Sequence, residues 1–444
     1  MLELYPYQKQ GVDFLVSHKG GLLADEQGLG KTIQALESCN YFNTKVVIIC
    51  PAIMRETWKY EAEKVLNEKS SVIRKDEDHI KWRNEDRRIL IYSYDFVSSH
   101  LNVVLQWVSR QKAVTIILDE SHYIKTPVAK RTKAVLKLLE NKNIINRILL
   151  TGTPVTRDID DLYIPMKIFL GDFAERKNIW QFRKAYMMDC SDYFGKKYKG
   201  FKSDVAKNYL IQDLKKFCIR RTKSKVLKEL PSITRKKIFL DVSKKVAEES
   251  MKLLDYALAY INQDHTSYNL YKKELEENNI HVSTIRRALG IAKAPQILDF
   301  IKHLNESGVK KVVLFCVHTE LINLLEKSLT TKFKDLKVSK IIGGTSDKQR
   351  QDIIQDFQKD DNDKHIIISN VLAGGVGITL TKSNVVVFGE IDWTPANLMQ
   401  AEARVHRITQ DKQVVSYYLV AKNSIDDRIL DVLKTKMKII KEIM

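Results

Sequence analysis

The sequence predicts an α/β protein in which two parallel sheets are separated by a mostly helical, basic segment. Short apolar runs recur in both halves of the 444-residue chain, and continuously apolar runs are typical of strands buried on both faces. Stretches with helical spacing lie between them, so the order β-α-β-α repeats, as in a parallel sheet covered by helices. A chain of this length is expected to form two or three domains.

The predicted strands fall into two series. Those of the first half are Val46–Cys50, Ile89–Tyr92, Thr115–Leu118 and Ile148–Leu150, and those of the second half are Val312–Phe315, His365–Ile368, Val385–Phe388 and Val414–Leu419. Helical spacing between strands is clear at Thr32–Asn40 and Thr319–Leu329. We therefore expect one sheet domain in residues 1–155 and a second in residues 286–444.

The middle of the chain, residues 156–285, has a different character. It contains few apolar runs suited to buried strands, and long helical patterns occupy Lys244–Asn262 and Ser267–Asn279. Residues 196–237 contain 15 Lys or Arg but only 3 Asp or Glu, so much of the positive charge is concentrated in one region. We interpret this segment as a helical, basic insertion and connector between the two sheets.

Charge and composition narrow the class of protein. The formal net charge of +19 favours a polyanionic partner, although a plain solvated surface can also be basic. No run of about 18 apolar residues occurs, and Met1–Lys9 lacks the apolar stretch of a signal peptide, so we expect no membrane partner and no secretion. The five cysteines are scattered without a CxxC pair, as reduced structural thiols are. The expected location is the cytoplasm, or the nucleus in a eukaryote.

A candidate phosphate loop occupies Asp25–Thr32, between an apolar run and a helical stretch. In such a loop, backbone N–H groups and the helix N-terminus bind the anion, with Gly28 and Gly30 allowing its close approach. Lys31 would reach the β- and γ-phosphates, and the Thr32 hydroxyl would bind Mg²⁺. The match to G-x4-G-K-[ST] is imperfect because Asp25 replaces the first glycine, and a glycine turn capping an ordinary helix is the alternative.

Two carboxylates at the end of a later strand support the nucleotide interpretation. Asp119 and Glu120 directly follow the apolar run Thr115–Leu118. Asp119 would provide a second Mg²⁺ contact, and Glu120 would polarise the attacking water. The alternative, a charged strand end facing solvent, is weaker beside Lys31 and Thr32. Together these segments predict a site for a nucleoside triphosphate.

The sequence also resembles the superfamily 2 helicases, and among them the SWI/SNF-type DNA-dependent ATPases and translocases, including annealing-helicase-like members. The segments that carry the resemblance, in family order, are Tyr5–Leu15, Leu23–Thr32 (motif I), Asp119–His122 (motif II), Leu149–Pro154 (motif III), Arg220–Lys223 with Val226–Pro231, Val312–Cys316 (motif IV), Ser369–Thr381 (motif V), Asp392–Pro395 and Gln400–Ile408 (motif VI). The resemblance implies two RecA-like lobes, ATP and Mg²⁺ as cofactors, and DNA as partner. It also implies that Gln8 reads adenine and that Gly377 and Gln400 lie at the nucleotide.

Motif VI contains two arginines three residues apart, Arg404 and Arg407. This spacing predicts that they share a helix face, and the resemblance implies that they stabilise the transferring phosphate charge. The alternative is a pair of surface arginines. We interpret His406 as a packing residue and His122 as a relay between motifs. Two departures, Thr379 and Thr409, affect expected DNA contacts rather than phosphate ligands.

The predicted DNA contacts come from several segments. They are Arg55, Thr345, Thr379, Thr381, Lys196, Lys197, Tyr198, Arg220 and Arg221. The stretch Asp192–Lys202 interleaves aromatic residues with lysines, which would suit stacking on unpaired bases while cations hold the backbone. A basic hairpin that packs its own aromatic residues is the alternative.

The leading hypothesis is an ATP-dependent DNA motor that acts as a monomer and remodels forked or branched DNA by unwinding or branch migration. One alternative is the duplex translocase subunit of a larger remodelling or restriction complex. Others are an RNA helicase, against which motif II and Arg220–Lys223 argue, and a DNA-binding scaffold without hydrolysis, against which Lys31 and Glu120 argue. The Lys-, Asn- and Ile-rich composition would suit an AT-rich genome, including that of a phage or virus.

Overall fold

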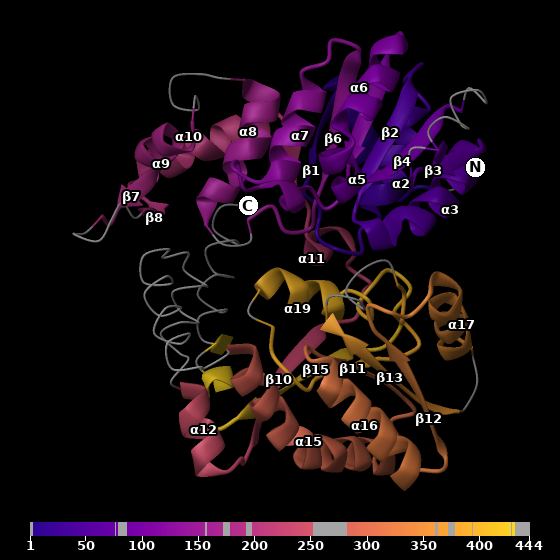
Figure 1. Ribbon diagram of the computed structural model, residues 1–444, viewed down its shortest axis with the longest axis vertical. Coiled ribbons are helices and arrows are strands. Elements are labelled where there is room, and N and C mark those ends of the chain that lie inside the picture. Colours follow the sequence, from indigo (N-terminus) through magenta and orange to yellow (C-terminus); the bar gives the residue numbers. More distant parts are fainter. Residues whose placement is uncertain are drawn as a thin grey trace. The chain divides into compact units, whose positions relative to one another are not determined.

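The computed structural model describes residues 3–75, 77–78, 87–155, 158–171, 178–191, 198–251, 282–359, 363–371, 378–392, 394–427 and 429–430. These residues form two compact units, which divide between Lys228 and Glu229. Each unit contains one large parallel sheet with helices on both faces (Figure 1). The α/β class with two parallel sheets is thus confirmed.

The sheet of the first unit has seven parallel strands in the order β3-β4-β2-β5-β6-β1-β9. Their bounds are β1 Gly20–Leu23, β2 Lys45–Cys50, β3 Ser70–Val72, β4 Ile89–Ser93, β5 Val114–Leu118, β6 Ile144–Leu150 and β9 Cys218–Ile219. The four apolar runs predicted in this half correspond to β2, β4, β5 and β6. Because neighbouring strands are parallel, their carboxyl ends share one edge of the sheet.

Helices cover both faces of this sheet, which explains why its strands are continuously apolar. On one face, α1 (Pro6–Ser17), α2 (Lys31–Cys39) and α3 (Arg55–Leu66) bury a cluster that includes Val46 and Ile48. On the other, α5 (Tyr94–Ser99), α6 (Leu101–Arg110) and α7 (Lys130–Leu139) bury a cluster that includes Val47 and Ile49. Short 3₁₀ turns at η1 (Ala52–Met54) and η2 (Ser121–Ile124) follow strands β2 and β5.

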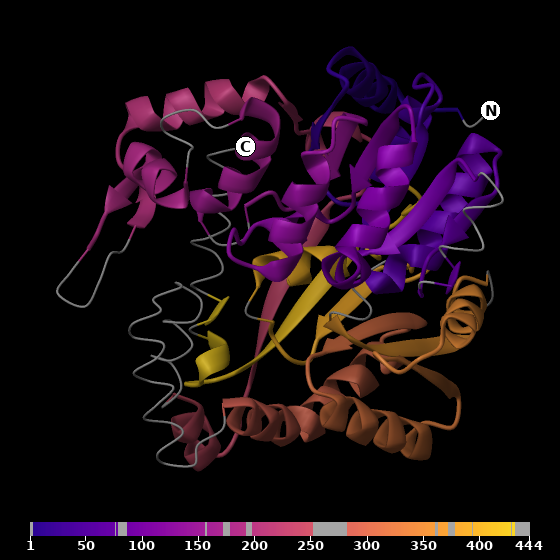
Figure 2. The same cartoon turned by 45° about the horizontal axis from the view of Figure 1, so that its top comes forward.

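A helical subdomain extends from the first sheet (Figures 1 and 2). It consists of η3 Ile159–Leu162, α8 Tyr163–Leu170, α9 Ile179–Tyr186, β7 Met187–Asp189, β8 Tyr198–Phe201 and α10 Asp204–Lys215. Strands β7 and β8 form an antiparallel hairpin. The core of the subdomain, including Phe182 and Leu210, is continuous with the cluster under α5–α7. After α10 the chain returns to the sheet, where β9 pairs with β1, and then forms α11 (Lys223–Val226).

The second unit contains a six-stranded parallel sheet in the order β10-β15-β14-β11-β13-β12. Its strands are β10 Ile233–Leu240, β11 Lys311–Cys316, β12 Leu336–Ile341, β13 Lys364–Asn370, β14 Val385–Phe388 and β15 Val414–Ala421. One face packs against α15 (Val282–Glu306) and α16 (Thr319–Lys332), and the other against α17 (Asp347–Phe357) and α19 (Pro395–Glu402), while α12 (Lys244–Met251) contacts α15. The four runs predicted in this half are β11, β13, β14 and β15.

The predicted middle segment, residues 156–285, is divided between the two units. Its helices α8–α10 belong to the first unit, whereas β10 is an edge strand of the second sheet and pairs with β15. Strand β10 was not among the predicted strands, because as an edge strand it carries charged residues such as Lys236 where a central strand would be apolar. The predicted helix at Ser267–Asn279 lies outside the described residues, and the three-part division of the chain stays a prediction.

None of the described helices combines the length and the apolar character needed to cross a bilayer.

Candidate active site

Three motifs of the first unit meet at one edge of its sheet. Motif I follows β1, motif III follows β6 and motif II follows β5, and these strands are neighbours in the order β5-β6-β1. Because the strands are parallel, residues separated by more than 90 positions in the sequence emerge side by side. Ligands of parallel α/β sheets bind at this carboxyl edge.

The phosphate loop owes its shape to two glycines. Gly28 and Gly30 have φ values of 87° and 74°, a conformation that glycine adopts without strain. A Cβ atom on Gly30 would lie 2.4 Å from Gln8 Nε2, so a side chain there would displace the terminal amide of Gln8 from the loop. Helix α2 begins directly after Gly30, and its N-terminal N–H groups are therefore available to a phosphate.

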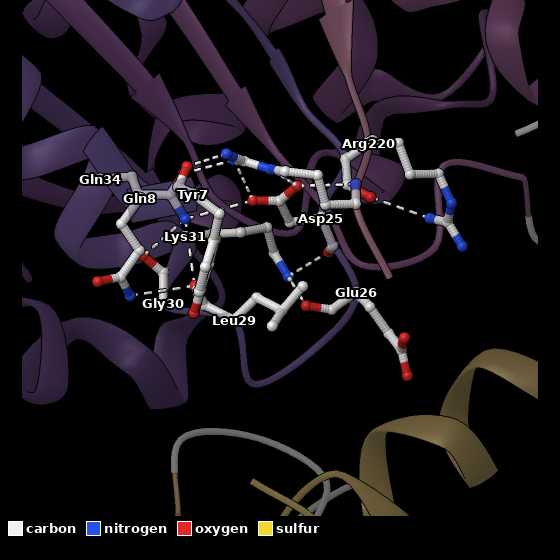
Figure 3. A network of polar contacts seen from close by, with 11 residues as sticks. Tyr7, Gln8, Asp25, Glu26, Leu29, Gly30, Lys31, Gln34 and Arg220 are labelled. Atoms are coloured by element: carbon white, nitrogen blue, oxygen red, sulfur yellow. Dashed lines mark hydrogen bonds and ion pairs between the residues drawn. The ribbon is translucent and has the colours of Figure 1, made fainter. Parts of the chain in front are cut away.

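Lys31 lies at the first position of α2, and its ammonium group folds back onto the loop. Lys31 Nζ donates to the Asp25 carbonyl at 2.8 Å and lies 3.5 Å from that of Glu26 (Figure 3). Burial lowers the pKa of Lys31, while the nearby carboxylates of Glu120, Asp25 and Asp119 oppose this shift. The lysine thus shares an electrostatic environment with the motif II acids, as expected for a site that binds both Mg²⁺ and phosphate.

Asp25, the residue that departs from the phosphate-loop pattern, is fully buried and ion-paired. Its Oδ1 accepts from the Arg221 backbone N–H at 3.0 Å and from Arg221 Nε at 2.9 Å. Its Oδ2 accepts from Arg221 Nη2 at 2.5 Å and from Gln34 Nε2 at 3.3 Å. The same guanidinium also donates to Gln34 Oε1 and to the Tyr7 carbonyl. Arg221 therefore joins α1, the phosphate loop and α2.

This placement corrects the prediction that Arg221 contacts DNA. The side chain is only 8% exposed, and its donors are already bound within the unit. The motif Arg220–Lys223 gave no sequence signal for this role, because Asp25 lies 196 positions away. A buried carboxylate inside a phosphate loop requires a counter-charge, and Arg221 provides it.

Arg220 connects motif I with motif III. Its Nη1 donates to the Ala24 carbonyl at 2.9 Å and lies 3.4 Å from the Gly152 carbonyl. Burial lowers the pKa of Arg220, opposed by Glu26 and other anionic neighbours. Its contact with DNA stays a prediction.

The predicted adenine reader, Gln8, lies against the phosphate loop. Its Nε2 donates to the Leu29 carbonyl at 3.3 Å and its Oε1 accepts from the Tyr5 N–H at 3.0 Å. Tyr7 also donates to the Leu29 carbonyl, so α1 holds the loop through two side chains (Figure 3). Adenine recognition by Gln8 stays a prediction.

Asp119 is buried at the end of β5 and is held from several directions. Its Oδ2 accepts from Trp58 Nε1 at 2.7 Å, its Oδ1 from the Glu120 N–H at 2.9 Å, and its carbonyl from the Tyr94 hydroxyl at 2.7 Å. Burial, and then the charge of Glu120, raise the pKa of Asp119 to about 6, while the Trp58 hydrogen bond acts in the opposite direction. Neither Trp58 nor Tyr94 was among the site residues predicted from the sequence.

Glu120 turns sharply after Asp119 in the left-handed region, with φ 47°. Its carboxylate lies 3.2 Å from His122 Nδ1, which also lies 3.3 Å from Thr151 Oγ1 of motif III. His122 therefore contacts both motifs, consistent with the predicted relay.

The oxygen donors near Lys31 fit a magnesium ion. Thr32 provides a hydroxyl in the first turn of α2, and Asp119 provides a carboxylate that a nearby cation would keep ionised. Hard oxygen ligands together with phosphate oxygens are the usual environment of Mg²⁺. Coordination by Thr32 and Asp119 stays a prediction.

In the second unit, the predicted helix around motif VI is shorter than expected. Helix α19 ends at Glu402, so the prediction that Arg404 and Arg407 share a helix face is wrong. The Arg404 carbonyl accepts from the Leu380 N–H at 2.8 Å and the Val405 carbonyl accepts from Gln410 Nε2 at 3.1 Å. These bonds take the carbonyls that a continuing helix would use.

Arg407 lies next to motif V. Its Nη1 donates to Thr379 Oγ1 at 2.5 Å, so the structure brings together an arginine predicted at the phosphate and a threonine predicted at DNA. Gln400 is buried in α19. His406 contacts the Pro231 carbonyl at 2.8 Å, in agreement with a packing role. Gly377 lies outside the described residues.

The remaining predicted DNA contacts are scattered. Arg55 is the first residue of α3, and Thr345 follows β12, where its hydroxyl accepts from the Ile342 N–H. Thr381 is buried, and its hydroxyl contacts Gln358 and Thr409. Tyr198 begins β8, whereas Lys196 and Lys197 lie outside the described residues.

Comparison with known families agrees with the motifs. A model of the SNF2-related domain matches residues 7–306, and a model of the helicase conserved C-terminal domain matches residues 292–409. The chain belongs to the SNF2-related family. This family consists of ATP-dependent helicase-type enzymes, and the two parallel-sheet units described above are its RecA-like lobes.

Individual relatives are similar over nearly the whole chain. The human DNA annealing helicase and endonuclease ZRANB3 is 28% identical over 455 residues, covering 98% of this chain and 40% of ZRANB3. The Caenorhabditis elegans homolog of SWI/SNF-related matrix-associated actin-dependent regulator of chromatin subfamily A-like protein 1 is 30% identical over 448 residues, covering 99% of this chain and 62% of the relative. This chain thus spans less than two thirds of either relative.

Among solved structures, the Sulfolobus solfataricus SWI2/SNF2 ATPase core in complex with dsDNA is similar, with 24% identity and a TM-score of 0.47. The alignment covers 100% of this chain and 93% of that one.

Proposed function

We propose that this protein is a DNA-dependent ATPase that moves on DNA and remodels forked or branched substrates. The observation that carries the proposal is the convergence of Lys31, Asp119 and Glu120 at one edge of the first sheet, where their charges influence one another. A cationic group for phosphate beside two acids is the arrangement that NTP hydrolysis requires.

In this proposal each motif of the first unit has one task. The loop N–H groups and Lys31 bind the phosphates, and Glu120 orients the attacking water. Mg²⁺, when bound, neutralises charge on the phosphate oxygens, and Thr32 and Asp119 would hold it. Catalysis then depends on positioning and electrostatic stabilisation, because phosphoryl transfer requires little covalent chemistry from the protein.

The second unit would supply the arginines. We propose that Arg404 and Arg407 act on the γ-phosphate, where a guanidinium stabilises the charge that develops during transfer. Arg407 has a second partner in Thr379 of motif V. If the Arg407 side chain leaves Thr379 to bind the nucleotide, hydrolysis would be coupled to motif V, a segment proposed to contact DNA.

The helical subdomain supports the choice of branched DNA. Trp180 on α9 is 51% exposed. Its ring centre lies 6.4 Å from that of Tyr198 and 5.1 Å from the Arg183 guanidinium. Residues 178–191 and 198–216 contain seven Lys or Arg and three Asp. An exposed aromatic surface among cations favours unpaired bases, since stacking is available to every base. The name of the relative ZRANB3, an annealing helicase, points the same way.

The decisive experiment combines two assays over a panel of DNAs. ATP hydrolysis is measured with no DNA and with single-stranded, duplex, forked and four-way-junction DNA, and strand exchange is followed on the same substrates. We expect branched DNA to stimulate hydrolysis and to be unwound or branch-migrated. The Lys31→Ala variant is the control and should lose both activities.

Other results would favour the other candidates. Stimulation by plain duplex without any strand change would indicate a translocase subunit of a larger complex. Stronger stimulation by a matched RNA duplex would indicate an RNA helicase. Hydrolysis that no nucleic acid stimulates would contradict the proposal as a whole. The expectation of a monomer stays a prediction.

A further inference from the structure

Trp58 has a buried polar group that the ATPase motifs leave unexplained. It lies in the first turns of α3 and its side chain is 0% exposed. The indole belongs to a buried cluster that also includes Ala35 and Leu36 of α2, the helix that begins with Lys31. Because this surrounding is closely packed, the indole is restricted to one orientation.

The indole N–H group of Trp58 is directed at the carboxylate of Asp119. Trp58 Nε1 donates to Asp119 Oδ2 at 2.7 Å, a short hydrogen bond between two buried groups. Two further donors, the Glu120 N–H to Oδ1 and the Tyr94 hydroxyl to the carbonyl, act on the same residue. Asp119 is thereby held at both carboxylate oxygens and at its backbone.

These bonds leave room for a metal ion. A carboxylate has about four lone-pair sites, and the two described hydrogen bonds to the Asp119 carboxylate occupy one site on each oxygen. The remaining sites can still bind a cation, and the direction in which they point is set by the indole on Oδ2 together with the Glu120 N–H on Oδ1.

We propose that Trp58 is a positioning residue for Mg²⁺, which holds the Asp119 carboxylate in the orientation that binds the ion together with ATP. This inference rests on the proposed function of the site and adds a residue to it. Partners that orient metal ligands commonly change metal affinity by about 10–100-fold when they are removed. A residue that only fills space would have no effect on the metal once the fold is intact.

The test separates the metal from the nucleotide. Trp58→Phe keeps an aromatic ring in the core and removes the N–H donor. Binding of a fluorescent, non-hydrolysable ATP analogue is titrated in EDTA and then against increasing Mg²⁺. We expect the affinity in EDTA to stay within about twofold of the native value, whereas the Mg²⁺ concentration for half-maximal tightening rises by about tenfold or more.

Trp107→Phe is the matched control. Trp107 is a buried tryptophan on α6 in the same unit, 6% exposed, and belongs to the cluster on the opposite face of the sheet. The same chemical change there should leave the Mg²⁺ dependence at the native value. If Trp58→Phe also binds Mg²⁺ with native affinity, Trp58 does not position the metal ligand and the inference is overturned.

A second measurement covers the case in which Trp58→Phe does not fold. The native protein is labelled with 5-fluorotryptophan, and its five tryptophans are assigned in ¹⁹F spectra by replacing the other four singly. Addition of Mg²⁺ to the nucleotide complex should shift the Trp58 resonance and leave that of Trp107 in place. An unshifted Trp58 resonance would overturn the inference. Native protein that binds no nucleotide would instead refute the proposed function itself.

Discussion

At the scale of single residues, the site depends on buried charges whose partners come from distant segments. Asp25 is fully buried and relies on Arg221 for its counter-charge. Asp119 is buried beside Glu120 and relies on Trp58 and backbone donors. Removal of a partner therefore affects these groups more than an equivalent change at the surface would, because an unpaired charge cannot be hydrated there.

Arg221→Ala should destabilise the first unit strongly. The change leaves the Asp25 carboxylate buried without its cation, which costs about 3–5 kcal/mol in comparable cases. The measurement is urea unfolding of the variant and of Lys137→Ala. Lys137 pairs with Glu140 on the surface, with side chains 65% and 64% exposed, so its loss should cost about 0.5 kcal/mol or less. Equal effects of the two changes would contradict the assigned role of Arg221.

Gly30→Ala should weaken nucleotide binding, because it strains the phosphate loop and displaces the Gln8 amide from it. Gly30 and Gly308 both have positive φ, 74° and 84°, so alanine at either position costs about 1–2 kcal/mol of backbone strain. A Cβ at Gly30 would also lie 2.4 Å from Gln8 Nε2, whereas at Gly308 nothing lies within 4 Å. We expect Gly308→Ala to lose only stability and to bind an ATP analogue normally. Normal binding by Gly30→Ala would argue against the loop geometry.

Asp119 should make stability depend on pH in the metal-free protein. Its pKa is raised from 3.8 to about 6, first by burial and then by Glu120. Between these values the folded protein holds a proton that the unfolded chain has released, so the free energy of unfolding falls as the pH rises through this window. Urea unfolding in EDTA from about pH 4 to about pH 7 measures the slope. Asp119→Asn should flatten it, and an unchanged slope would show that other groups cause it.

Among the elements, continuous apolar runs predicted four of the five interior strands of the first sheet, β1 being the exception, and all four interior strands of the second. These runs do not alternate between polar and apolar residues, because both faces of each strand are buried under helices. Edge strand β10 escaped because its sequence, Ile233–Leu240, mixes charged and apolar residues. The end of α19 also escaped, since it is set by bonds from Leu380 and Gln410, which no local pattern reveals.

The residues of the candidate site also fall into those that the sequence predicts and those that it does not. Lys31, Asp119 and Glu120 were predictable because they directly follow apolar strands or begin a helix. Arg221 and Trp58 were not, because their partners Asp25 and Asp119 are brought to them only by the sheet order.

The helical subdomain should contribute to binding of single-stranded DNA. Trp180→Ala removes an exposed ring beside Tyr198 and Arg183, and loss of one stacked base costs about 1–3 kcal/mol. Fluorescence anisotropy with a single-stranded oligonucleotide should show weaker binding, which Trp180→Phe largely restores. Tyr41→Ala, at a residue 69% exposed after α2, is the control and should bind normally. Equal loss at both positions would indicate a nonspecific effect.

In the proposed mechanism the two units of the protein have complementary tasks. The first contains the phosphate loop and the acids, and the second contains Arg404, Arg407 and motif V. A net charge of +19 suits a motor that holds DNA mainly through its phosphates, which gives affinity without sequence choice. We therefore expect that neither unit hydrolyses ATP efficiently by itself.

The measurement that checks this expectation is ATP hydrolysis by Arg407→Ala in the presence of forked DNA. Apart from its contacts with motif V, such as the hydrogen bond to Thr379, Arg407 is not proposed to hold the fold, and the proposed phosphate-binding groups belong to the first unit. The variant should therefore keep its fold and bind an ATP analogue as the native protein does. Its hydrolysis rate should fall by about 10³-fold or more, as when an arginine finger is lost. Hydrolysis at the native rate would show that Arg407 does not act on the nucleotide.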